Sequence, residues 1–407
     1  MKSGLDSLRP IVGEQTIDEL HALAAPLRGK RIQHINATRV GGGVAELLGR
    51  IVPLMNELGL VASWDVLSAD EEFFRVTKSF HNAIQGEAIE LSAGDYEVYV
   101  QGNRRNSESI ALEGDFVILH DPQPCALIER RKSHPQRCIW RCHIDASHPH
   151  RGLWTFLSRY LRRYDAAIFS TPVFTRPLAI PQYVVAPAID PLSDKNRTLE
   201  LPEVLAVLEG YRIDAARPIL TQISRFDRFK DPLGVIQAFR MVRETNDCQL
   251  VLAGGAASDD PEGAEVLAEV REAAGEDPDI HVLELPPDAH RTVNALQRSA
   301  AVVLQKSLKE GFGLTVSEAL WKGRPVIGGA TGGIPLQVLD GINGYLVYSA
   351  EGAAFRTRHL LNHPEAAVQM GRRGVDQVRQ NFLLTRNIRD YLLIMNLTLA
   401  GATSMTL

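Results

Sequence analysis

The chain has 407 residues, which is enough for two or three domains and too many for a single small module. Apolar residues make up 45% of it and charged residues 23%, proportions of an ordinary globular protein that exclude disordered, collagenous and membrane-embedded chains. With a formal net charge of −5, the chain lacks an overall basic field that would gather nucleic acid or a membrane surface, and we expect neither as a partner.

The ends of the chain and its cysteines predict a cytoplasmic protein. Residues 1–10 mix charged side chains with no apolar run, so nothing marks them for secretion. Residues 391–407 carry no charge, but they contain too few apolar residues to span a membrane. Without a secretion signal, four cysteines in a chain of this length are expected to be reduced thiols.

In the first half of the chain, strand-like and helical segments alternate. A helix is predicted over residues 16–27 and a buried strand over residues 31–38. Three glycines then open a second helix, whose apolar side chains recur at helical spacing as far as Gly59, which stands where a C-terminal cap belongs. Further strands are predicted at residues 61–67, 116–120, 139–143, 166–170 and 183–188.

A polar, turn-rich stretch at residues 190–196 predicts a domain boundary near residue 190, and a second alternating series follows it. Its strands are expected at residues 218–224, 249–253, 280–283, 301–305 and 325–328, and its helices at residues 232–243, 262–274, 288–299 and 315–322. Such alternation predicts the α/β class, with parallel sheets and right-handed crossovers. Because open sheets bind ligands at the carboxyl ends of their strands, a cleft between two domains is the expected site.

The strongest local signal is the run from Glu310 to Glu318, Glu-Gly-Phe-Gly-Leu-Thr-Val-Ser-Glu, at a strand-to-helix turn. Thr315 and Glu318 have the spacing of a capping box, which would hold Glu318 for structural reasons alone. Glu310 stands beside glycines that let the main chain approach a ligand, and the helix that follows favours an anion at its N-terminus. Capping and ligand binding both stay open for Glu318, whereas Glu310 is a candidate binding residue.

Two cations, Arg225 and Lys230, stand in the loop after the first strand of the second series. An arginine can hold a diphosphate through two parallel hydrogen bonds, and a lysine can hold it as a point charge. A solvated charged loop is the plain alternative. It is weakened because this loop is expected to face the same cleft as the Glu310 turn.

The first half of the chain offers weaker candidates. Gly41, Gly42 and Gly43 follow a strand but lack the G-x-G-x-x-G spacing of a dinucleotide site, and a tight turn explains them equally well. His143 and Asp145 end a strand two positions apart, so their side chains are expected on one face of it, toward the cleft. A buried histidine at a strand end is the plain alternative for His143.

Polar residues at the end of another strand, Asp121 and Gln123, would suit a small hydroxylated ligand, although the neighbouring prolines also fit an ordinary turn. Cysteines and histidines at residues 138–150 invite a zinc interpretation. Their C-x3-C-H spacing matches no common structural zinc site, so we expect no metal there. The motifs of serine hydrolases and of P-loop proteins are missing from the sequence.

Taken together, the two glutamates and the Arg225 and Lys230 loop resemble those of the retaining GT-B glycosyltransferases of family 4. More narrowly, the chain is similar to the trehalose glycosyltransferring synthases. That similarity rests on residues 34–46, 80–86, 120–124, 140–145, 224–227 and 309–323. It covers nearly the whole chain and is loose at residues 170–182.

The resemblance implies two Rossmann-like domains that face an interdomain cleft. Residues 1–190, with 381–407 crossing back as a C-terminal helix, would form the acceptor side, and residues 191–380 would bind the nucleotide sugar. The implied reaction is reversible transfer of glucose from a nucleoside diphosphate glucose to free glucose, giving α,α-trehalose with retention. The sequence does not choose among uridine, adenosine and guanosine as the nucleoside. The resemblance further implies small-molecule substrates, no metal or other cofactor, and a homodimer.

The resemblance also assigns roles to individual residues. The candidate catalytic groups are His143, Glu310, Arg225 and Lys230. The two cations would hold the diphosphate, Glu318 would bind the ribose, and His143 would lie against the donor glucose near its reacting carbon. The donor glucose would be bound by Glu310 and by the backbone amides of Gly311, Phe312, Gly313 and Leu314. Gly42 and Gly43 would let the backbone approach the phosphates, and the acceptor would contact Asp121, Gln123 and Asp145.

Two alternative functions stay open. A retaining trehalose phosphorylase would use the same site with inorganic phosphate in place of the donor's diphosphate. A nucleotide-sugar-binding protein would keep the site without turnover. A requirement for nucleotide rather than phosphate separates the first alternative from the transferase, and measured turnover eliminates the second.

Overall fold

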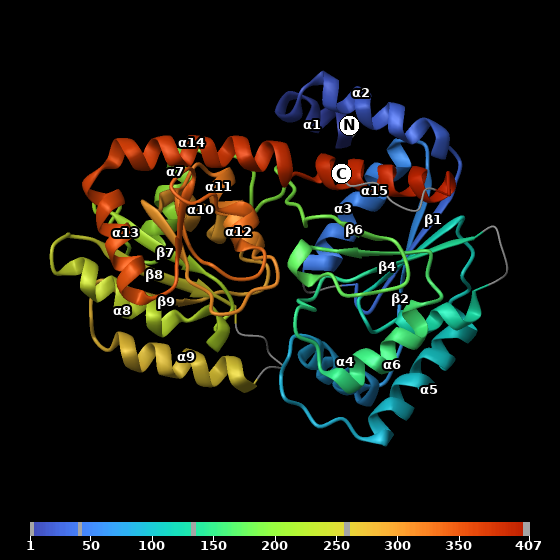
Figure 1. Cartoon of the computed structure of the whole chain (residues 1–407). Coiled ribbons are helices and arrows are strands. Elements are labelled where there is room, and N and C mark those ends of the chain that lie inside the picture. Colours follow the sequence, from blue (N-terminus) through green and yellow to red (C-terminus); the bar gives the residue numbers. More distant parts are fainter. Residues whose placement is uncertain (1–3, 40–42, 132–135, 256–260, 402–407) are drawn as a thin grey trace. The chain divides into compact units, whose positions relative to one another are not determined.

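The computed structural model describes residues 4–39, 43–131, 136–255 and 261–401. The chain divides into two compact units, of which unit 1 comprises Met1–Ala188 and Leu384–Leu407 and unit 2 comprises Ile189–Leu383. Each unit contains a six-stranded parallel sheet between helices (Figure 1). The predicted α/β class is therefore confirmed.

The sheet of unit 1 has the strand order β2-β1-β3-β4-β5-β6. Its strands are β1 (Arg31–Asn36), β2 (Val61–Val66), β3 (Phe116–His120), β4 (Arg137–Arg141), β5 (Ala166–Phe169) and β6 (Gln182–Val184). Residues of β3 and β5 are all buried, as expected for parallel strands covered on both faces. The order reverses between β1 and β3, and the carboxyl ends of the strands beside such a reversal are where open sheets bind ligands.

Helices cover both faces of the unit 1 sheet. They are α1 (Gly4–Val12), α2 (Glu14–Ala24), α3 (Gly43–Glu57), α4 (Glu71–Ile84), α5 (Ala93–Ser109), α6 (Arg151–Leu161) and α15 (Leu384–Leu399), with short 3-10 turns η1 (Ala25–Leu27), η2 (Cys125–Arg130) and η3 (Pro172–Phe174). One apolar core joins the sheet to α1, α2, α3 and α15, and a second joins it to α4, α5 and α6. The last helix, α15, packs along α2 and α3, so the end of the chain completes unit 1 (Figure 1).

The sheet of unit 2 has the order β12-β11-β10-β7-β8-β9 and reverses between β10 and β7. Its strands are β7 (Ile219–Ile223), β8 (Gln249–Gly254), β9 (Ile280–Glu284), β10 (Val302–Gln305), β11 (Val326–Gly329) and β12 (Gly344–Val347). No strand was predicted for residues 344–347, which form β12 beside β11. The last strand of unit 1 is also shorter than expected, since β6 ends at Val184 rather than at residue 188.

The helices of unit 2 likewise form two layers. They are α7 (Leu201–Gly210), α8 (Pro232–Arg243), α9 (Pro261–Ala274), α10 (His290–Ser299), α11 (Leu314–Trp321), α12 (Ile334–Gln337), α13 (Ala350–Asn362) and α14 (Pro364–Asn381), with the 3-10 turn η4 (Arg228–Lys230). One core holds α8, α9 and α13 against the sheet, and the other holds α7 and α10. Predicted and observed bounds of α8 are the same.

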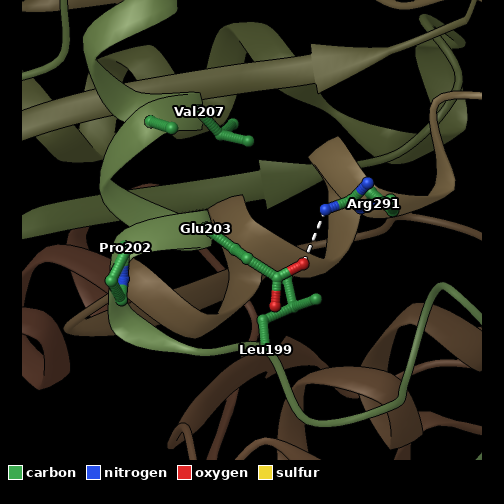
Figure 2. Close-up of a pocket in the computed structure, with 6 residues that line it drawn as sticks. Leu199, Pro202, Glu203, Val207 and Arg291 are labelled. Carbon is green, nitrogen blue, oxygen red and sulfur yellow. Dashed lines mark hydrogen bonds and ion pairs between the residues drawn. The ribbon is translucent and has the colours of Figure 1, made fainter.

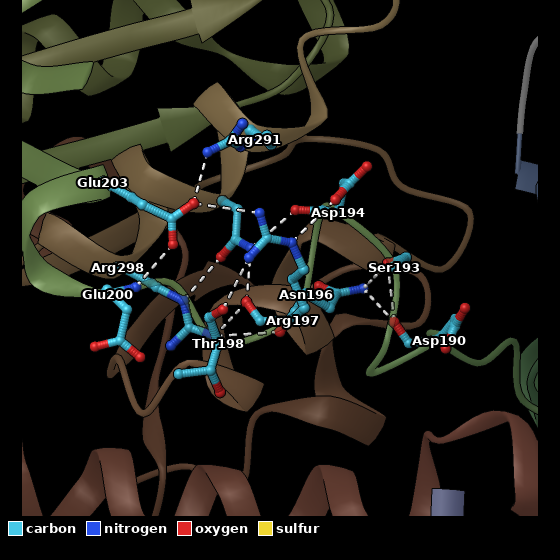
Figure 3. Close-up of polar contacts among 11 residues, drawn as sticks. Asp190, Ser193, Asp194, Asn196, Arg197, Thr198, Glu200, Glu203, Arg291 and Arg298 are labelled. Carbon is cyan, nitrogen blue, oxygen red and sulfur yellow. Dashed lines mark hydrogen bonds and ion pairs between the residues drawn. The ribbon is translucent and has the colours of Figure 1, made fainter. Parts of the chain in front are cut away.

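The polar stretch that opens unit 2 is held by hydrogen bonds rather than by an apolar core (Figure 3). Asn196 donates to the carbonyl of Asp190, and Arg298 of α10 donates to the carbonyls of Asn196 and Arg197. Asn294, one turn earlier on α10, donates to the carbonyl of Arg197 as well. These contacts tie the start of the unit to the helix that precedes β10.

Candidate functional site

An ion pair in unit 2 joins the two segments that the sequence singled out. Lys230 ends η4, directly after β7, and Glu310 lies in the loop after β10, so both follow strands beside the reversal of the sheet. The Lys230 Nζ atom lies 2.8 Å from Glu310 Oε1, and the two side chains are only 16% and 8% exposed. The fold thus brings together a predicted cation and a predicted carboxylate at the place where ligands bind such sheets.

The carboxylate of Glu310 is held in a fixed orientation. Its second oxygen accepts hydrogen bonds from the Ser307 hydroxyl at 3.1 Å and from the Gln305 amide at 3.4 Å. Lys230 occupies the first oxygen, but an ammonium group has three N–H donors and only one is directed at Glu310. Lys230 can therefore bind a further anion while it keeps the carboxylate in place.

Arg225 is the exposed member of the group. Its side chain is 62% exposed, and its acidic partner within the described part of the chain is Asp227, at 3.5 Å. An exposed pair at that distance contributes little to stability, so the guanidinium is available to a ligand.

The turn from Glu310 into α11 is built on glycines. Gly313 is the N-cap residue of α11, with the left-handed φ of 80° that glycine adopts without strain. A Cβ on Gly332 would collide with the carbonyl oxygen of Glu310, and Gly333 donates its N–H to the carbonyl of Gly311. This second glycine pair was not predicted, although two adjacent glycines after β11 are a signal visible in the sequence.

The predicted capping box is wrong. Because α11 begins at Leu314, Thr315 lies inside its first turn and donates to Gln305 Oε1 at 3.4 Å instead of capping the helix. Glu318 is a residue of the second turn and is buried, at 7% exposed. Helix capping therefore does not explain Glu318.

A buried lysine one turn after Glu318 supports the same helix. Lys322 Nζ donates to the carbonyl of Glu318, to Asn196 Oδ1 and to Gln297 Oε1, at 2.8–3.1 Å. Burial lowers the pKa of Lys322 to about 7, while the nearby Glu318 carboxylate acts in the opposite direction. Sequence reasoning did not identify Lys322, because a lysine at a helix end is usually a solvated residue.

A second ion pair in unit 2 was also not predicted. Lys306, the first residue after β10, is buried and bonds to Asp231. Asp231 is the N-cap of α8, has a left-handed φ of 51°, and accepts the amide of Gly234. The pair fixes the start of α8 directly after the Lys230 turn.

In unit 1, His143 follows β4 and is half-buried. Its backbone N–H donates to Asp121 Oδ1 at 2.7 Å, and its ring bonds to His120. Asp121, the first residue after β3, has a left-handed φ of 64°. Burial raises the pKa of Asp121 to about 7, and the amide of His143 and the charge of Arg141 lower it in part.

The expected strand-end placement of His143 and Asp145 is wrong. The strand β4 ends at Arg141, so both residues belong to the following loop and strand alternation does not apply to them. Asp145 is buried and accepts the backbone N–H of Ser147, which gives it a structural role in that loop.

Two other predicted groups can be placed only in part. The backbone carbonyl of Gln123 accepts the side-chain amide of Asn103, whereas its Oε1 atom is buried and has no hydrogen-bond partner among the described residues. Gly43 is the first residue of α3. Gly41 and Gly42 lie outside the described residues.

A separate hollow of about 590 Å³ lies on unit 2 between α7 and α10 (Figure 2). It is lined mainly by apolar side chains, and its carboxylate, Glu203, already bonds to Arg291 at 2.6 Å and to Arg197 at 3.3 Å. None of the predicted site residues lines it.

Two findings concern the described residues as a whole. All four cysteines lie within them and are buried free thiols. In the same part of the chain, no helix has the length and apolar character that crossing a membrane would need.

Comparison with known proteins places these features in a family. The model of the trehalose synthase N-terminal domain matches residues 34–176, and that of the glycosyl transferases group 1 matches residues 208–377. The chain is 44% identical to a trehalose synthase of Pyrococcus horikoshii over 402 residues, which cover 97% of this chain and 96% of that protein. The chain belongs to the trehalose synthase family. A family member from Rubrobacter xylanophilus is 45% identical over 395 residues, 95% of each chain.

Solved structures agree on the fold of this family member. An α,α-trehalose 6-phosphate synthase from Burkholderia multivorans matches with a TM-score of 0.73 at 14% identity and covers 92% of this chain and 98% of that one. A sucrose-phosphate synthase from Thermosynechococcus elongatus matches with a TM-score of 0.68 at 16% identity and covers 92% and 100%. The fold is that of GT-B glycosyltransferases, as the sequence predicted.

Proposed function

We propose that the chain is a retaining glucosyltransferase that forms α,α-trehalose reversibly from a nucleoside diphosphate glucose and free glucose. The observation that carries the proposal is the 44% identity, over nearly the full length of both chains, to a protein named trehalose synthase. The Lys230–Glu310 pair at the reversal of the unit 2 sheet supports it, because the cation suits the donor's diphosphate and the carboxylate suits its sugar hydroxyls.

The cations would act on the leaving group. Breaking the anomeric bond leaves positive charge on the sugar and negative charge on the departing diphosphate. Arg225 is exposed, and Lys230 keeps two N–H donors beyond the one it gives to Glu310, so both can hold the phosphate oxygens without a metal ion. Donors aimed at charge that develops in the transition state account for roughly 10²- to 10³-fold in rate each.

The remaining residues would hold the donor. Glu310, oriented by Lys230 and Ser307, would accept hydrogen bonds from glucose hydroxyls, and the N-terminal amides of α11 would face the same ligand. Glu318 would accept hydrogen bonds from the ribose. His143 would lie against the donor glucose.

Retention would follow from attack on the face that the diphosphate leaves. The oxygen of the acceptor's anomeric hydroxyl would form a bond to the anomeric carbon of the donor glucose. At the same time, the bond between that carbon and the diphosphate oxygen would break. Its proton passes to the departing phosphate oxygen, so the products are trehalose and a nucleoside diphosphate. Closure of a site around the donor would exclude water and suppress hydrolysis.

Phosphorolysis of trehalose is the alternative reaction, because the chain also has trehalose phosphorylases among its more distant relatives. The chain is 29% identical to a trehalose phosphorylase of Pleurotus pulmonarius over 404 residues, which cover 54% of that longer protein. A phosphorylase would need inorganic phosphate and no nucleotide.

The reverse reaction separates the possibilities. Purified protein is incubated with trehalose and UDP, ADP or GDP, and a parallel sample receives inorganic phosphate alone; products are identified by ³¹P NMR. We expect an α-configured nucleoside diphosphate glucose in at least one nucleotide sample. Glucose 1-phosphate in the phosphate sample alone would establish phosphorolysis, and no product in any sample would refute both reactions.

A further inference from the structure

Three histidines form a continuous hydrogen-bonded row that runs from the middle of β1 to the carboxyl edge of the unit 1 sheet. His34 Nδ1 lies 3.0 Å from His120 Nε2, and His120 Nδ1 lies 2.9 Å from His143 Nε2. Neighbouring rings meet edge to edge, with centroids 5.3 and 5.2 Å apart and ring planes inclined by 28° and 15°. His34 and His120 come from β1 and β3, the two strands between which the sheet order reverses, so the row runs from the core to His143 at the expected ligand edge.

Burial disfavours the charged form of all three rings. Burial lowers the pKa of His34 to about 3 and lowers the pKa of His120 and of His143 well below the ordinary value. The buried guanidinium of Arg141 acts in the same direction on His120 and His143. Among the described residues, two further titratable groups lie beside these histidines: Asp121, whose carboxylate accepts the His143 amide, and Tyr391, whose ring meets that of His34 edge-on.

Each neutral imidazole has one N–H donor and one lone pair. The two hydrogen bonds among these three rings can therefore form in only two arrangements, which differ in the direction of donation. In the first, His34 donates to His120 and His120 donates to His143, so the free proton of His143 is on Nδ1. In the second, every bond is reversed, and His34 must carry its proton on Nε2. His34 Nε2 is buried and has no hydrogen-bond partner among the described residues.

The buried end decides between the two directions. In the second arrangement, His34 Nε2 would be a buried N–H donor without an acceptor. In the first arrangement, the same atom is an acceptor without a donor. Orphaned buried N–H groups are rarer than under-satisfied acceptors, and an unmade donor bond costs about 1–3 kcal/mol. At the other end, His143 Nδ1 has no partner among the described residues, and the half-buried ring can present it to a ligand.

We propose that His34 and His120 are positioning residues that hold His143 as a neutral imidazole with its proton on Nδ1, so that the ring presents an N–H donor to a hydroxyl oxygen of the donor sugar. The ligand assigned to His143 rests on the proposed function, but its proton position does not. Two buried histidines that touch no substrate thus determine whether the ring offers a donor or an acceptor.

The direct test is histidine-selective ¹⁵N NMR of the unliganded wild-type chain, with the His143 signals assigned by their loss in His143→Gln. We expect a protonated Nδ1 and an unprotonated Nε2 on His143 at pH 7.5. A proton on Nε2, or a doubly protonated ring, would overturn the proposal. This readout needs no catalytic activity, so it stands or falls separately from the transferase assignment.

The kinetic test compares two variants of His34. In His34→Asn, the amide keeps an N–H donor near the position of Nδ1, whereas His34→Leu removes the donor and frees His120 to adopt either tautomer. We expect kcat/KM for the nucleotide sugar to fall roughly tenfold in His34→Leu, equivalent to one hydrogen bond of about 1.4 kcal/mol, and to return to within about threefold of wild type in His34→Asn. Equal losses in the two variants, with His143 keeping its Nδ1 proton in both, would show that His34 serves packing alone.

Discussion

The Lys230–Glu310 pair allows the structure to be tested without any substrate. Replacing Lys230 by Met keeps most of the side-chain volume but leaves the Glu310 carboxylate, only 8% exposed, without its cation. Removing one partner of a buried ion pair costs about 3–5 kcal/mol. Because Glu310 keeps the Ser307 and Gln305 donors, we expect the low end of that range, about 3 kcal/mol.

The second substitution in this test is Glu310→Gln, which removes the stranded charge. An amide at this position needs no cation, so Lys230→Met combined with Glu310→Gln should be about 2 kcal/mol more stable than Lys230→Met alone, as expected when two residues in contact are coupled. Lys230→Met, Glu310→Gln and the double variant should each lose most of their transferase activity, since both residues are assigned to the donor site. Stability and activity are therefore expected to separate.

Differential scanning calorimetry provides the measurement. A loss of about 3 kcal/mol should lower the Tm of the unit 2 transition by roughly 6–12 °C, and the double variant should regain more than half of that decrease. A Lys230→Met protein as stable as wild type, or a double variant no more stable than Lys230→Met, would refute the claim that this pair is a buried, coupled one.

Three further predictions use other parts of the chain. Arg225→Ala should lower kcat by roughly 10²- to 10³-fold with a Tm change of under about 2 °C, since the side chain is 62% exposed; steady-state kinetics that stay near normal would remove Arg225 from the diphosphate site. Glu318→Gln should raise the KM for the nucleotide sugar more than it lowers the Tm, whereas a large Tm decrease with an unchanged KM would indicate a structural role only. His34, His120 and His143 have a folded-state pKa below the unfolded value of about 6.5, so below that pH the unfolded protein binds more protons than the folded one. The free energy of unfolding should therefore be fully retained above pH 6.5. Below it, each of these histidines should lower the free energy of unfolding by up to about 1.4 kcal/mol per pH unit, and His34 should do so down to pH 3. Urea titrations between pH 7.5 and 5 check this, and a His34→Leu variant with the same slope as wild type would contradict it.

The sequence predicted the architecture because its signals were local and repeated. Strands such as Phe116–His120 are continuous apolar runs bounded by turns, and the helix Pro232–Arg243 shows both its apolar face and its start signal. The strand Gly344–Val347 was not predicted; it pairs in parallel with the preceding strand, Val326–Gly329, at the edge of the sheet.

Site residues were predictable where charge and glycine stood together in one segment. Glu310, Lys230 and Arg225 could be selected because each belongs to a loop that leaves a strand's carboxyl end. The row of histidines could not be, since His34, His120 and His143 are distant in sequence and meet only through strand order. The capping-box prediction failed for a related reason, because the glycine turn moved the start of the helix to Leu314.

The most direct test of the central claim is the transfer reaction itself, observed in the forward direction. Purified protein is given the α-configured glucose donor with UDP, ADP or GDP as its nucleoside diphosphate, together with glucose labelled with ¹³C at its anomeric carbon, and the products are followed by NMR. The account predicts α,α-trehalose with the label in one of its two rings and release of one nucleoside diphosphate per trehalose. A β-linked product, or hydrolysis of the donor to free glucose without any disaccharide, would contradict it.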